Sequence, residues 1–253
     1  LPARHAPPFP SGNRISRYLC GVQYRVLWDH LEPCPYRQGE QARMPLRLPI
    51  GPLTATQFDA CLEAGDRRSG RMLYRTRCPA CTGCEPLRVP VSKFQPSKSQ
   101  RRAWTRNASQ VRLSVGPPIV DHVRLDLFNR HKLERGLSQS GEPLSETAYL
   151  SWLVDTCVDT REFSYWVGDR LVAISILDCG QTSVSSVYHY FDPSESARSL
   201  GVFSVLAELA WASAHNYTWY YLGFYVSDCQ HLRYKSDYRP HERRIGGVWS
   251  PAV

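Results

Sequence analysis

The chain has 253 residues, of which 42% are hydrophobic, 11% aromatic and 21% charged, and its net charge is +8. This composition is that of a globular protein of one or two domains, with at most a short disordered tail over residues 1–13. No apolar run approaches the roughly 18 to 20 residues of a membrane-spanning helix, and the opening segment is too polar and proline-rich for a signal peptide.

The first half of the chain, residues 14–110, has few regular patterns. Prolines and cysteines interrupt short apolar pieces throughout it. One helix is predicted over residues 54–64, with Thr54 as its N-cap. We therefore expect a small, loop-rich module that carries cysteines and a small sheet.

The second half, residues 111–253, shows regular periodicity. Apolar spacing predicts helices over 121–134 and 145–158. Alternating runs predict an antiparallel meander, and a helix and an aromatic strand follow it; the ranges are 162–167, 170–178, 183–191, 199–214 and 218–226. This order resembles the acyltransferase fold of the GNAT type. The predicted class is therefore α+β, with a cysteine-bearing module followed by a GNAT-like domain whose sheet is mainly antiparallel.

The phosphate-binding loop of coenzyme A-dependent GNAT enzymes is incomplete in this chain. Those enzymes hold the pyrophosphate with Q/R-x-x-G-x-G/A at the start of the central helix, whereas this chain reads Arg198-Ser-Leu-Gly201-Val-Phe203. The bulky Phe203 would obstruct close approach of the backbone to a phosphate. We therefore expect an acyl donor other than coenzyme A.

Basic residues are concentrated between Arg67 and Arg106. This window holds 11 Lys and Arg residues and a single acidic residue, Glu85, so it carries more positive charge than the whole chain. Because its arginines alternate with cysteines, prolines and apolar residues, the window is expected to fold and to attract a polyanion, nucleic acid first. The alternative is a solvated basic face.

The nine cysteines, an odd number without an export signal, indicate a reducing compartment. Cys78, Cys81 and Cys84 form a C-x2-C-x2-C motif that suits zinc or an iron–sulfur cluster. Cys34 is the preferred fourth ligand and Cys20 the second choice. The alternative is a set of thiols packed in a loop-rich core.

The chain lacks the sequence motifs of ATP-binding loops, dinucleotide-binding folds, hydrolase elbows and zincin proteases. A donor that is already activated as an ester needs no ATP. Aminoacyl-tRNA is such a donor, and it is also a polyanion for the basic window.

Ten collinear segments resemble the aminoacyl-tRNA protein transferases, which comprise bacterial aspartate/glutamate leucyltransferases and eukaryotic arginyltransferases. The segments are Cys34-Pro-Tyr36, Arg67-Arg-Ser-Gly70 with Tyr74-Arg75, Cys78 to Cys84, Pro86-Leu-Arg-Val-Pro-Val91, Phe94, Pro96-Ser-Lys-Ser-Gln-Arg-Arg102, Val187-Tyr-His-Tyr-Phe-Asp-Pro193, Ser199-Leu-Gly201, Tyr221-Leu-Gly-Phe-Tyr225 and Tyr234-Lys-Ser-Asp-Tyr-Arg-Pro240. The resemblance implies a cytoplasmic enzyme that transfers leucine or arginine from tRNA to proteins beginning with Asp or Glu and marks them for degradation. The C-x2-C-x2-C motif looks like the leucyl branch, whereas Tyr225-Val-Ser-Asp-Cys229 looks like the arginyl branch.

Transfer of the aminoacyl group requires a neutral acceptor amine, alignment and donors for an oxyanion. An α-amino group has a pKa of about 7.7 to 8.0, so a modest base suffices. The candidates for base or proton relay are Asp192 and Asp228, with His189 and Tyr225 as helpers. The alternatives are a turn position for Asp192 and an ordinary sheet position for His189.

Substrate contacts are expected from cations and aromatic rings. An acceptor carboxylate needs an arginine, and bases at the single-stranded tRNA end stack on rings. The candidate substrate-binding residues are Arg67, Arg68, Ser69, Arg75, Tyr188, Tyr190, Tyr221, Tyr234, Tyr238 and Arg239. The candidates for tRNA phosphates are Lys98, Arg101, Arg102, Arg106, Arg233 and Lys235.

Two functions of other classes stay open at the level of sequence. One is a non-catalytic nucleic-acid-binding protein whose cysteine loop is a zinc knuckle, and the other is a coenzyme A acetyltransferase, against which Phe203 argues. The sequence does not indicate an oligomeric state.

Overall fold

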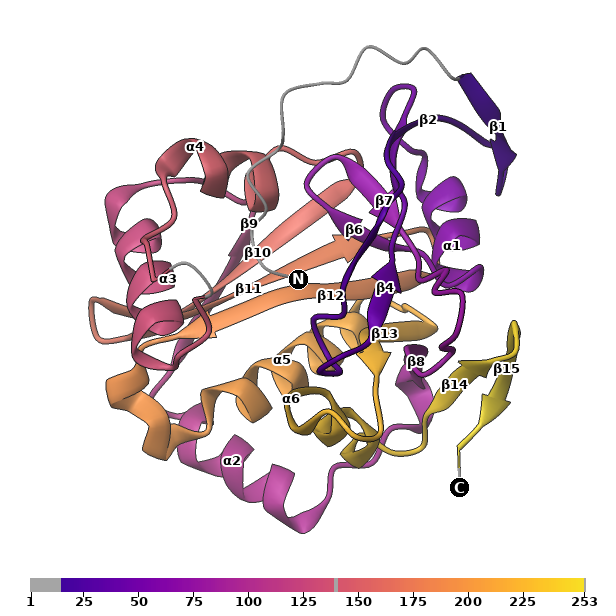
Figure 1. The fold of residues 1–253 in the computed structure, drawn as a ribbon. Helices are drawn as coiled ribbons and strands as arrows, with labels where there is room; N and C mark the ends of the chain where they lie inside the picture. Colours follow the sequence, from indigo (N-terminus) through magenta and orange to yellow (C-terminus); the bar gives the residue numbers. More distant parts are fainter. Residues whose placement is uncertain (1–14, 139–140, 253) are drawn as a thin grey trace.

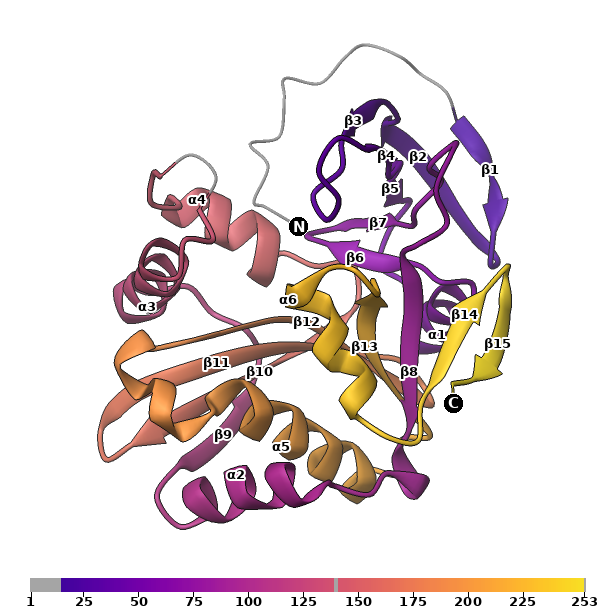
Figure 2. The ribbon, with the colours of Figure 1, turned by 60° about the horizontal axis from the view of Figure 1, so that its bottom comes forward.

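The computed structural model describes residues 15–138 and 141–252, which form two main sheets and a short two-stranded sheet (Figures 1 and 2). The tail expected over residues 1–13 lies outside the described residues. The mixed α/β class and the mainly antiparallel sheet are confirmed. No helix among the described residues has the length and apolarity needed to cross a membrane.

The larger sheet has eight strands in the order β15-β14-β8-β13-β12-β11-β10-β9. Their bounds are β8 Glu85–Pro90, β9 Arg112–Gly116, β10 Asp159–Val167, β11 Arg170–Cys179, β12 Ser183–Phe191, β13 Trp219–Tyr225, β14 Glu242–Ile245 and β15 Val248–Pro251. The expected meander is confirmed, because β10, β11 and β12 pair antiparallel in chain order. Strand β8 comes from the N-terminal half and pairs with β13, so this sheet includes residues from both sides of the boundary predicted near residue 110.

Strands β12 and β13 are the one parallel pair of the described sheet, and they pair over a short stretch only. The register joins Ser183–Ser185 to Trp219–Tyr221. Beyond it, Ser186–Phe191 and Leu222–Tyr225 have no ladder pairing with each other. We call this unpaired region, bounded by the second half of each strand, the β12–β13 fork.

One face of the large sheet is covered by α5 (Leu200–Ala214), against which α2 (Lys98–Ala108) packs (Figure 2). The core on this face joins apolar side chains of α5, such as Leu209, to Tyr220 of β13 and Tyr165 of β10. A 3-10 turn, Pro193–Arg198, leads into α5, and another, Val91–Lys93, follows β8.

The opposite face is covered by two groups of elements. Helices α3 (His122–Glu134) and α4 (Glu146–Tyr149), with a π-helical turn over Leu150–Val154, pack on β11 and β12. The N-terminal sheet, in the order β1-β2-β5-β7-β6, and helix α1 (Ala55–Glu63) contact Tyr221 of β13. The N-terminal strands are β1 Ile15–Leu19, β2 Val22–Trp28, β5 Leu46–Pro49, β6 Arg67–Ser69 and β7 Met72–Tyr74, and the short hairpin is β3 Leu31–Pro33 with β4 Gln41–Arg43.

Three elements differ from the sequence-based expectation. Helix α2 lies in a segment that was expected to be irregular. The helix predicted over 145–158 ends at Val154, because Asp155 adopts an extended backbone. The C-terminal segment after β13 contains a short helix, α6 (Gln230–Arg233), and a 3-10 turn over Tyr234–Asp237. The other predicted helices agree with the structure, each beginning within one residue of its predicted start.

Candidate functional site

Arg67 enters the mouth of the β12–β13 fork from strand β6. Its Nη1 donates to Ser185 Oγ at 2.6 Å and its Nη2 donates to the backbone oxygen of Ser186, the first residue of β12 that does not pair with β13. The residue is about nine-tenths buried. One arginine of the N-terminal sheet is thereby held at the point where the two central strands of the large sheet separate.

Lys235 reaches the same place from the C-terminal segment. It is buried, and its Nζ donates to the backbone oxygen of Phe224 at 3.0 Å. Gly223, with φ of +95°, leaves the space for both cations: a Cβ there would lie 3.0 Å from Lys235 Nζ and 3.3 Å from Arg67 Nη2. Burial, and then the neighbouring Arg67, lower the pKa of Lys235 to about 7.

The partners of these two cations are neutral oxygens, namely one hydroxyl and two carbonyls. Two buried positive charges side by side repel each other, and an anion between them would relieve that repulsion. The Arg67–Lys235 pair is therefore suited to receive a carboxylate.

Glu208 of α5 lies on the other face of the sheet, next to the same fork. The Tyr220 hydroxyl donates to its Oε2 at 2.5 Å, and the Ser175 and Ser186 side chains favour its charged form. Its Oε1 is buried without a partner among the described residues. Burial raises the pKa of Glu208 to about 7. A buried carboxyl group that exchanges its proton near neutral pH is suited to proton transfer.

Glu208 was not among the predicted site residues. Lys235 was predicted to contact tRNA phosphates, whereas in the structure its side chain is buried. A readable signal existed for Glu208. It is the single acidic residue in the apolar helix Leu200–Ala214, and a charge on a buried helix face calls for a specific partner. The burial of Lys235 could not be predicted from a local pattern, because it depends on where the C-terminal segment folds back onto the large sheet.

The basic window is not one continuous surface. Arg68 forms a fully buried ion pair with Asp178, with 2.6 Å between Nε and Oδ2. Arg75 pairs with Asp66 at 2.6 Å, and Arg88 pairs with Glu242 at 2.8 Å and also with Glu63. The expectation that the whole window faces a polyanion is therefore wrong for these three residues, because carboxylates already neutralise them. Ser69 lies in β6 opposite Met72.

The basic side chains of α2 are exposed instead. Lys98, Arg102 and Arg106 follow one another at four-residue spacing, with Arg101 beside them. The helix begins with a capping box between Ser97 and Gln100. The Gln100 amide also donates to the backbone oxygen of Asp237 at 3.2 Å, which joins the start of α2 to the segment that carries Lys235.

Arg233 and Arg239 are exposed on that C-terminal segment, on either side of the buried Lys235. Arg239 Nε donates to the backbone oxygen of Ser236 at 3.3 Å. These two residues and the exposed side chains of α2 therefore lie on elements in direct contact, and together they form the α2 basic surface: Lys98, Arg101, Arg102, Arg106, Arg233 and Arg239.

The four residues expected to move protons are not brought together. Asp192 is buried at the end of β12, where Arg170 Nη1 lies 2.6 Å from it, and Asp228 is exposed beside Arg37 at 3.0 Å. The pKa of Asp192 stays below its usual value, although burial raises it, because Ser194 and two arginines favour the carboxylate. Burial lowers the pKa of His189 to about 3, so this imidazole is neutral. Tyr225, at the end of β13, stacks against Arg243 at 4.8 Å.

The predicted tyrosines are distributed over three places. Tyr188 and Tyr190 pack against Phe128 under α3, and the Tyr190 hydroxyl contacts that of Tyr149 at 2.5 Å. Tyr221 is buried beneath the N-terminal layer, with its hydroxyl 3.1 Å from Arg88. Next to the fork, Tyr238 is buried against Phe94, while Tyr234 is 45% exposed. Tyr234 is therefore the predicted ring that is open to a nucleotide base.

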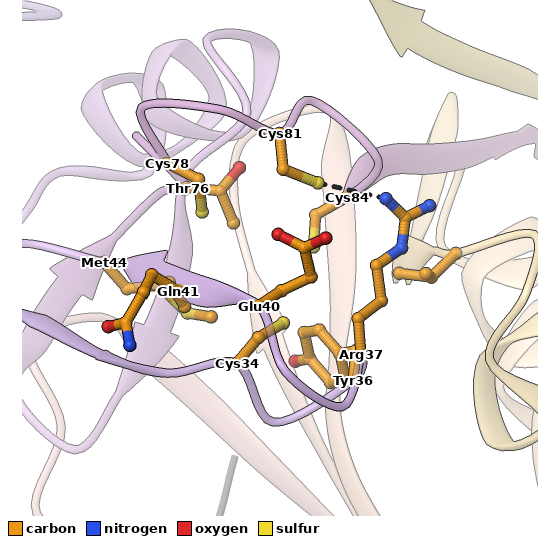
Figure 3. A pocket seen from close by; sticks show the side chains of 12 residues that line it. Cys34, Tyr36, Arg37, Glu40, Gln41, Met44, Thr76, Cys78, Cys81 and Cys84 are labelled. Atoms are coloured by element: carbon orange, nitrogen blue, oxygen red, sulfur yellow. Dashed lines mark hydrogen bonds between the residues drawn. The ribbon is translucent and has the colours of Figure 1, made fainter.

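Cys34, Cys78, Cys81 and Cys84 line one small cavity, together with Arg37 and Glu40 (Figure 3). Arg37 Nη1 donates to Cys81 Sγ at 3.1 Å. The backbone amides of Gly83 and Arg43 donate to Cys81 and Cys78, both at 3.4 Å. Burial, and then the three other thiols, raise the pKa of Cys84 to about 12.

The chemistry of this donor set suits a thiolate-bound metal, although no three of the four sulfurs lie within 4.8 Å of one another in the described structure. Four sulfurs from two loops face one cavity, and amide–sulfur hydrogen bonds of this kind stabilise metal-bound thiolates. Cys34 lies in the cavity wall, whereas Cys20, the second choice for a fourth ligand, contacts Cys61 in another part of the N-terminal layer.

Comparisons with known proteins match most of the chain. Two family models match, described as the N terminus of arginine-tRNA-protein transferase over residues 32–102 and its C terminus over residues 123–245. An aspartate/glutamate leucyltransferase of Acinetobacter baylyi is 34% identical over 232 residues, which cover 91% of this chain and 84% of the relative. The enzyme of the same name from Aeromonas salmonicida is 34% identical over 216 residues, covering 85% and 90%.

Among solved structures, a putative lysylphosphatidylglycerol synthetase domain from Agrobacterium fabrum aligns with a TM-score of 0.49 and 14% identity over 76% of this chain and 62% of that chain. L-PGS from Bacillus licheniformis aligns with a TM-score of 0.47 and 14% identity, over 66% and 58%.

Proposed function

The chain belongs to the arginine-tRNA-protein transferase family, and from this premise we propose that it transfers leucine from leucyl-tRNA to the α-amino group of proteins that begin with Asp or Glu. The chain is thus an aminoacyl-tRNA–protein transferase. Leucine is favoured over arginine because the curated relatives at 34% identity carry the name aspartate/glutamate leucyltransferase. Attachment of leucine would mark the acceptor for degradation.

The observation that carries the proposal is the Arg67–Lys235 pair beside Gly223. An acceptor beginning with Asp or Glu brings one carboxylate within a few bonds of its α-amino group. A carboxylate placed between the two cations would leave that amine in the β12–β13 fork. The same pair repels an acceptor that begins with Lys or Arg, so it both attracts the correct acceptor and rejects the opposite charge.

The chemical step forms a bond between the acceptor nitrogen and the aminoacyl carbonyl carbon and breaks the bond from that carbon to the ribose oxygen. The amine gives up one proton and the ribose oxygen takes one, so no external oxidant or metal is needed for balance. Glu208, with its pKa of about 7, is our candidate for the proton acceptor, with the Ser186 side chain between it and the fork. Alignment of amine and ester supplies the larger share of the acceleration.

The α2 basic surface is our candidate for the tRNA phosphates. It is exposed, and it is joined through Gln100 and Asp237 to the segment that carries Lys235. Phosphate contacts on this surface would fix the position of the acceptor stem, and Tyr234 offers a ring to an unpaired base near the fork. Of the residues assigned to the acceptor by sequence, we retain Arg67 and leave out Arg68 and Arg75, whose charges are neutralised by Asp178 and Asp66.

We propose a GNAT-like arrangement for the larger sheet. The support is the antiparallel meander, followed by a helix and by a parallel strand that pairs over three residues and then separates. Phe203 at the start of α5 is buried between Trp104 and Tyr165. This filled loop supports the expectation that coenzyme A is not the donor.

Zinc or an iron–sulfur cluster at Cys34, Cys78, Cys81 and Cys84 is proposed as a structural group. When bound, it would fix the loop that follows β7 and precedes β8, through thiolate coordination. We assign this group no step of the transfer reaction, in which Arg67, Lys235 and Glu208 have the proposed roles. A cytoplasmic location remains a prediction from the resemblance.

The test is a transfer assay with purified protein, in which leucyl-tRNA and arginyl-tRNA are each presented with peptides that begin with Asp, Glu, Asn or Lys. We expect leucine to appear on the Asp and Glu peptides and on neither of the others. Arginine transfer at an equal rate would overturn the choice of donor. Binding of tRNA without transfer to any peptide would favour the non-catalytic RNA-binding alternative.

A further inference from the structure

Two thiols outside the cysteine cavity lie together in the N-terminal layer. Cys20 occupies the turn between β1 and β2 with φ of +52°, and Cys61 lies in the last turn of α1. The two sulfurs and a carboxylate oxygen of Asp66 all lie within 4.8 Å of one another. Neither thiol has a part in the proposed transfer reaction.

The surroundings of this cluster are wrong for a metal ion. Asp66 already accepts two hydrogen bonds from Arg75, at 2.6 and 2.7 Å, and a further one from Arg47. An added cation would therefore meet two guanidinium groups and a carboxylate that already accepts three hydrogen bonds. The same positive charges favour a negatively charged sulfur.

The two thiols differ as an attacking and a resolving cysteine must differ. Cys61 is 1% exposed, whereas Cys20 is partly exposed. A hydrogen bond from Cys61 lowers the pKa of Cys20 to about 6, and Arg75 acts in the same direction. The bond to Cys20 and burial raise the pKa of Cys61 well above its usual value. Partly exposed thiolates beside a second thiol are the groups that oxidants attack first.

We propose that Cys20 and Cys61 form a reversible disulfide when the protein meets a peroxide. The Cys20 sulfur attacks one peroxide oxygen, the O–O bond breaks, and the departing hydroxide takes a proton to become water. Cys20 is then a sulfenic acid. The Cys61 sulfur attacks the Cys20 sulfur, the S–O bond breaks, and the hydroxide leaves as water with the proton of Cys61. Two electrons pass from the two sulfurs to the peroxide, and a dithiol reverses the change.

The bond would tie the β1–β2 turn to helix α1 and remove the negative charge next to Arg75. Cys157 is a matched control within the same layer, because it packs in the same cluster and burial raises its pKa to about 11. It has no reason to react at neutral pH.

The experiment treats the reduced 253-residue protein with an equimolar amount of hydrogen peroxide at pH 7, alkylates the remaining thiols, and maps the peptides by mass spectrometry without reduction. We expect a Cys20–Cys61 linked peptide, two hydrogens lighter than its parts, that disappears after dithiothreitol. In Cys61→Ser, Cys20 should instead be trapped as a sulfenic acid by dimedone. Cys157 should be recovered as a thiol.

A second measurement uses the wild-type protein alone. The rate at which iodoacetamide alkylates Cys20 should reach half its maximum near pH 6, at least two pH units below that of an ordinary thiol. The proposal is overturned if Cys20 is recovered unmodified under peroxide, if it pairs with a cysteine other than Cys61, or if its alkylation rises only above pH 8.

Discussion

Lys235 combines a positive charge with a buried position next to a second cation. Its ammonium group is buried beside Arg67, with a carbonyl oxygen as its partner. Burying a charge without a counter-ion costs stability, so a ligand that brings a negative charge would stabilise this position. The acceptor carboxylate that we propose supplies the missing counter-ion.

Replacing Lys235 by Met should raise KM for an Asp-starting peptide by roughly tenfold to 100-fold, the range expected for a lost hydrogen bond to a charged group. The kcat should change less. An Asn-starting peptide is the control, because the preference for Asp over Asn should largely disappear in Lys235→Met. The midpoint of thermal unfolding should stay the same or rise, since a buried charge is removed. An unchanged preference for Asp would contradict the assignment.

The same residue predicts a pH dependence. Because the pKa of Lys235 is about 7 in the folded protein, against an ordinary value of 10.5 for a solvated lysine, the lysine is charged below pH 7 and becomes neutral above it. Binding of an Asp peptide with a blocked amine should therefore weaken by up to about tenfold for each pH unit above 7. The contribution of Lys235 to folding stability has the opposite trend, rising between pH 7 and 10.5, because the unfolded chain binds the extra proton there. Competitive inhibition measured from pH 6 to 9 checks the first trend, and Lys235→Met should show none.

Glu208 carries the third prediction. If it accepts the proton of the amine, Glu208→Gln should lower kcat at pH 7 by roughly 100-fold or more, with little change in KM. The defect should shrink above pH 8.5, where the acceptor amine is neutral without help. Glutamine keeps the shape of the side chain and an oxygen for the Tyr220 hydroxyl, so the fold should persist. A purely structural role would leave the pH profile parallel to that of the wild type.

At the scale of elements, hydrophobic periodicity predicted the helices and strands that bury a continuous apolar face. Helix α5 and the meander have continuous apolar faces, and they appear within one to three residues of the predicted bounds. Helix α2 was missed because it buries Gln100, Ala103 and Asn107 and so has no apolar stripe. Its capping box, Ser97 with Gln100, was the readable signal. The π-helical turn over Leu150–Val154 has no pattern of its own, so the end of that helix could not be predicted.

Gly70 occupies the turn between β6 and β7, at a position that a residue with a Cβ would not fit. Its φ is +58°, and a Cβ would lie 2.4 Å from the backbone oxygen of Ser151. Gly168, in the turn between β10 and β11, also has φ of +58° but has nothing within 4 Å of that position. Gly168→Ala should therefore lose only the conformational preference, about 1 kcal/mol.

Gly70→Ala should lose that amount and the cost of displacing the Ser151 backbone, about 2 to 4 kcal/mol in total. Because Arg67 lies in the same hairpin, KM for the acceptor should rise as well. Denaturant unfolding of both variants measures the difference. Equal losses of unfolding free energy at the two glycines would show that the contact with Ser151 does not constrain the turn.

At the scale of the molecule, the fork brings together residues that are far apart in the sequence. Arg67 comes from β6, Ser186 from β12, Gly223 from β13 and Lys235 from the C-terminal segment. The sequence identified three of these segments as motifs, but which cation is neutralised depends on the packing of the N-terminal sheet on the large sheet. Arg67 and Arg68 are adjacent in sequence, yet Arg68 meets Asp178 of β11 and Arg67 meets none of the described carboxylates. No local pattern distinguishes them.

The same layering divides the basic window between the two faces of the large sheet, and this leads to a prediction about tRNA. Strand β6, which begins with Arg67, lies in the N-terminal layer, and α2 packs on α5 on the opposite face of the large sheet (Figure 2). An RNA that contacts α2 must therefore reach the fork past the segment from Tyr234 to Arg239. Replacing Arg101 and Arg102 by Gln should reduce the slope of log affinity for tRNA against log salt concentration by about 1.5, given roughly 0.7 to 0.9 for each phosphate contact. KM for the acceptor peptide should not change. The control is Arg25→Gln with Arg135→Gln, which removes the same charge from exposed sites on β2 and after α3. If both double variants lower the slope equally, the net charge of the protein and not the α2 basic surface attracts the tRNA.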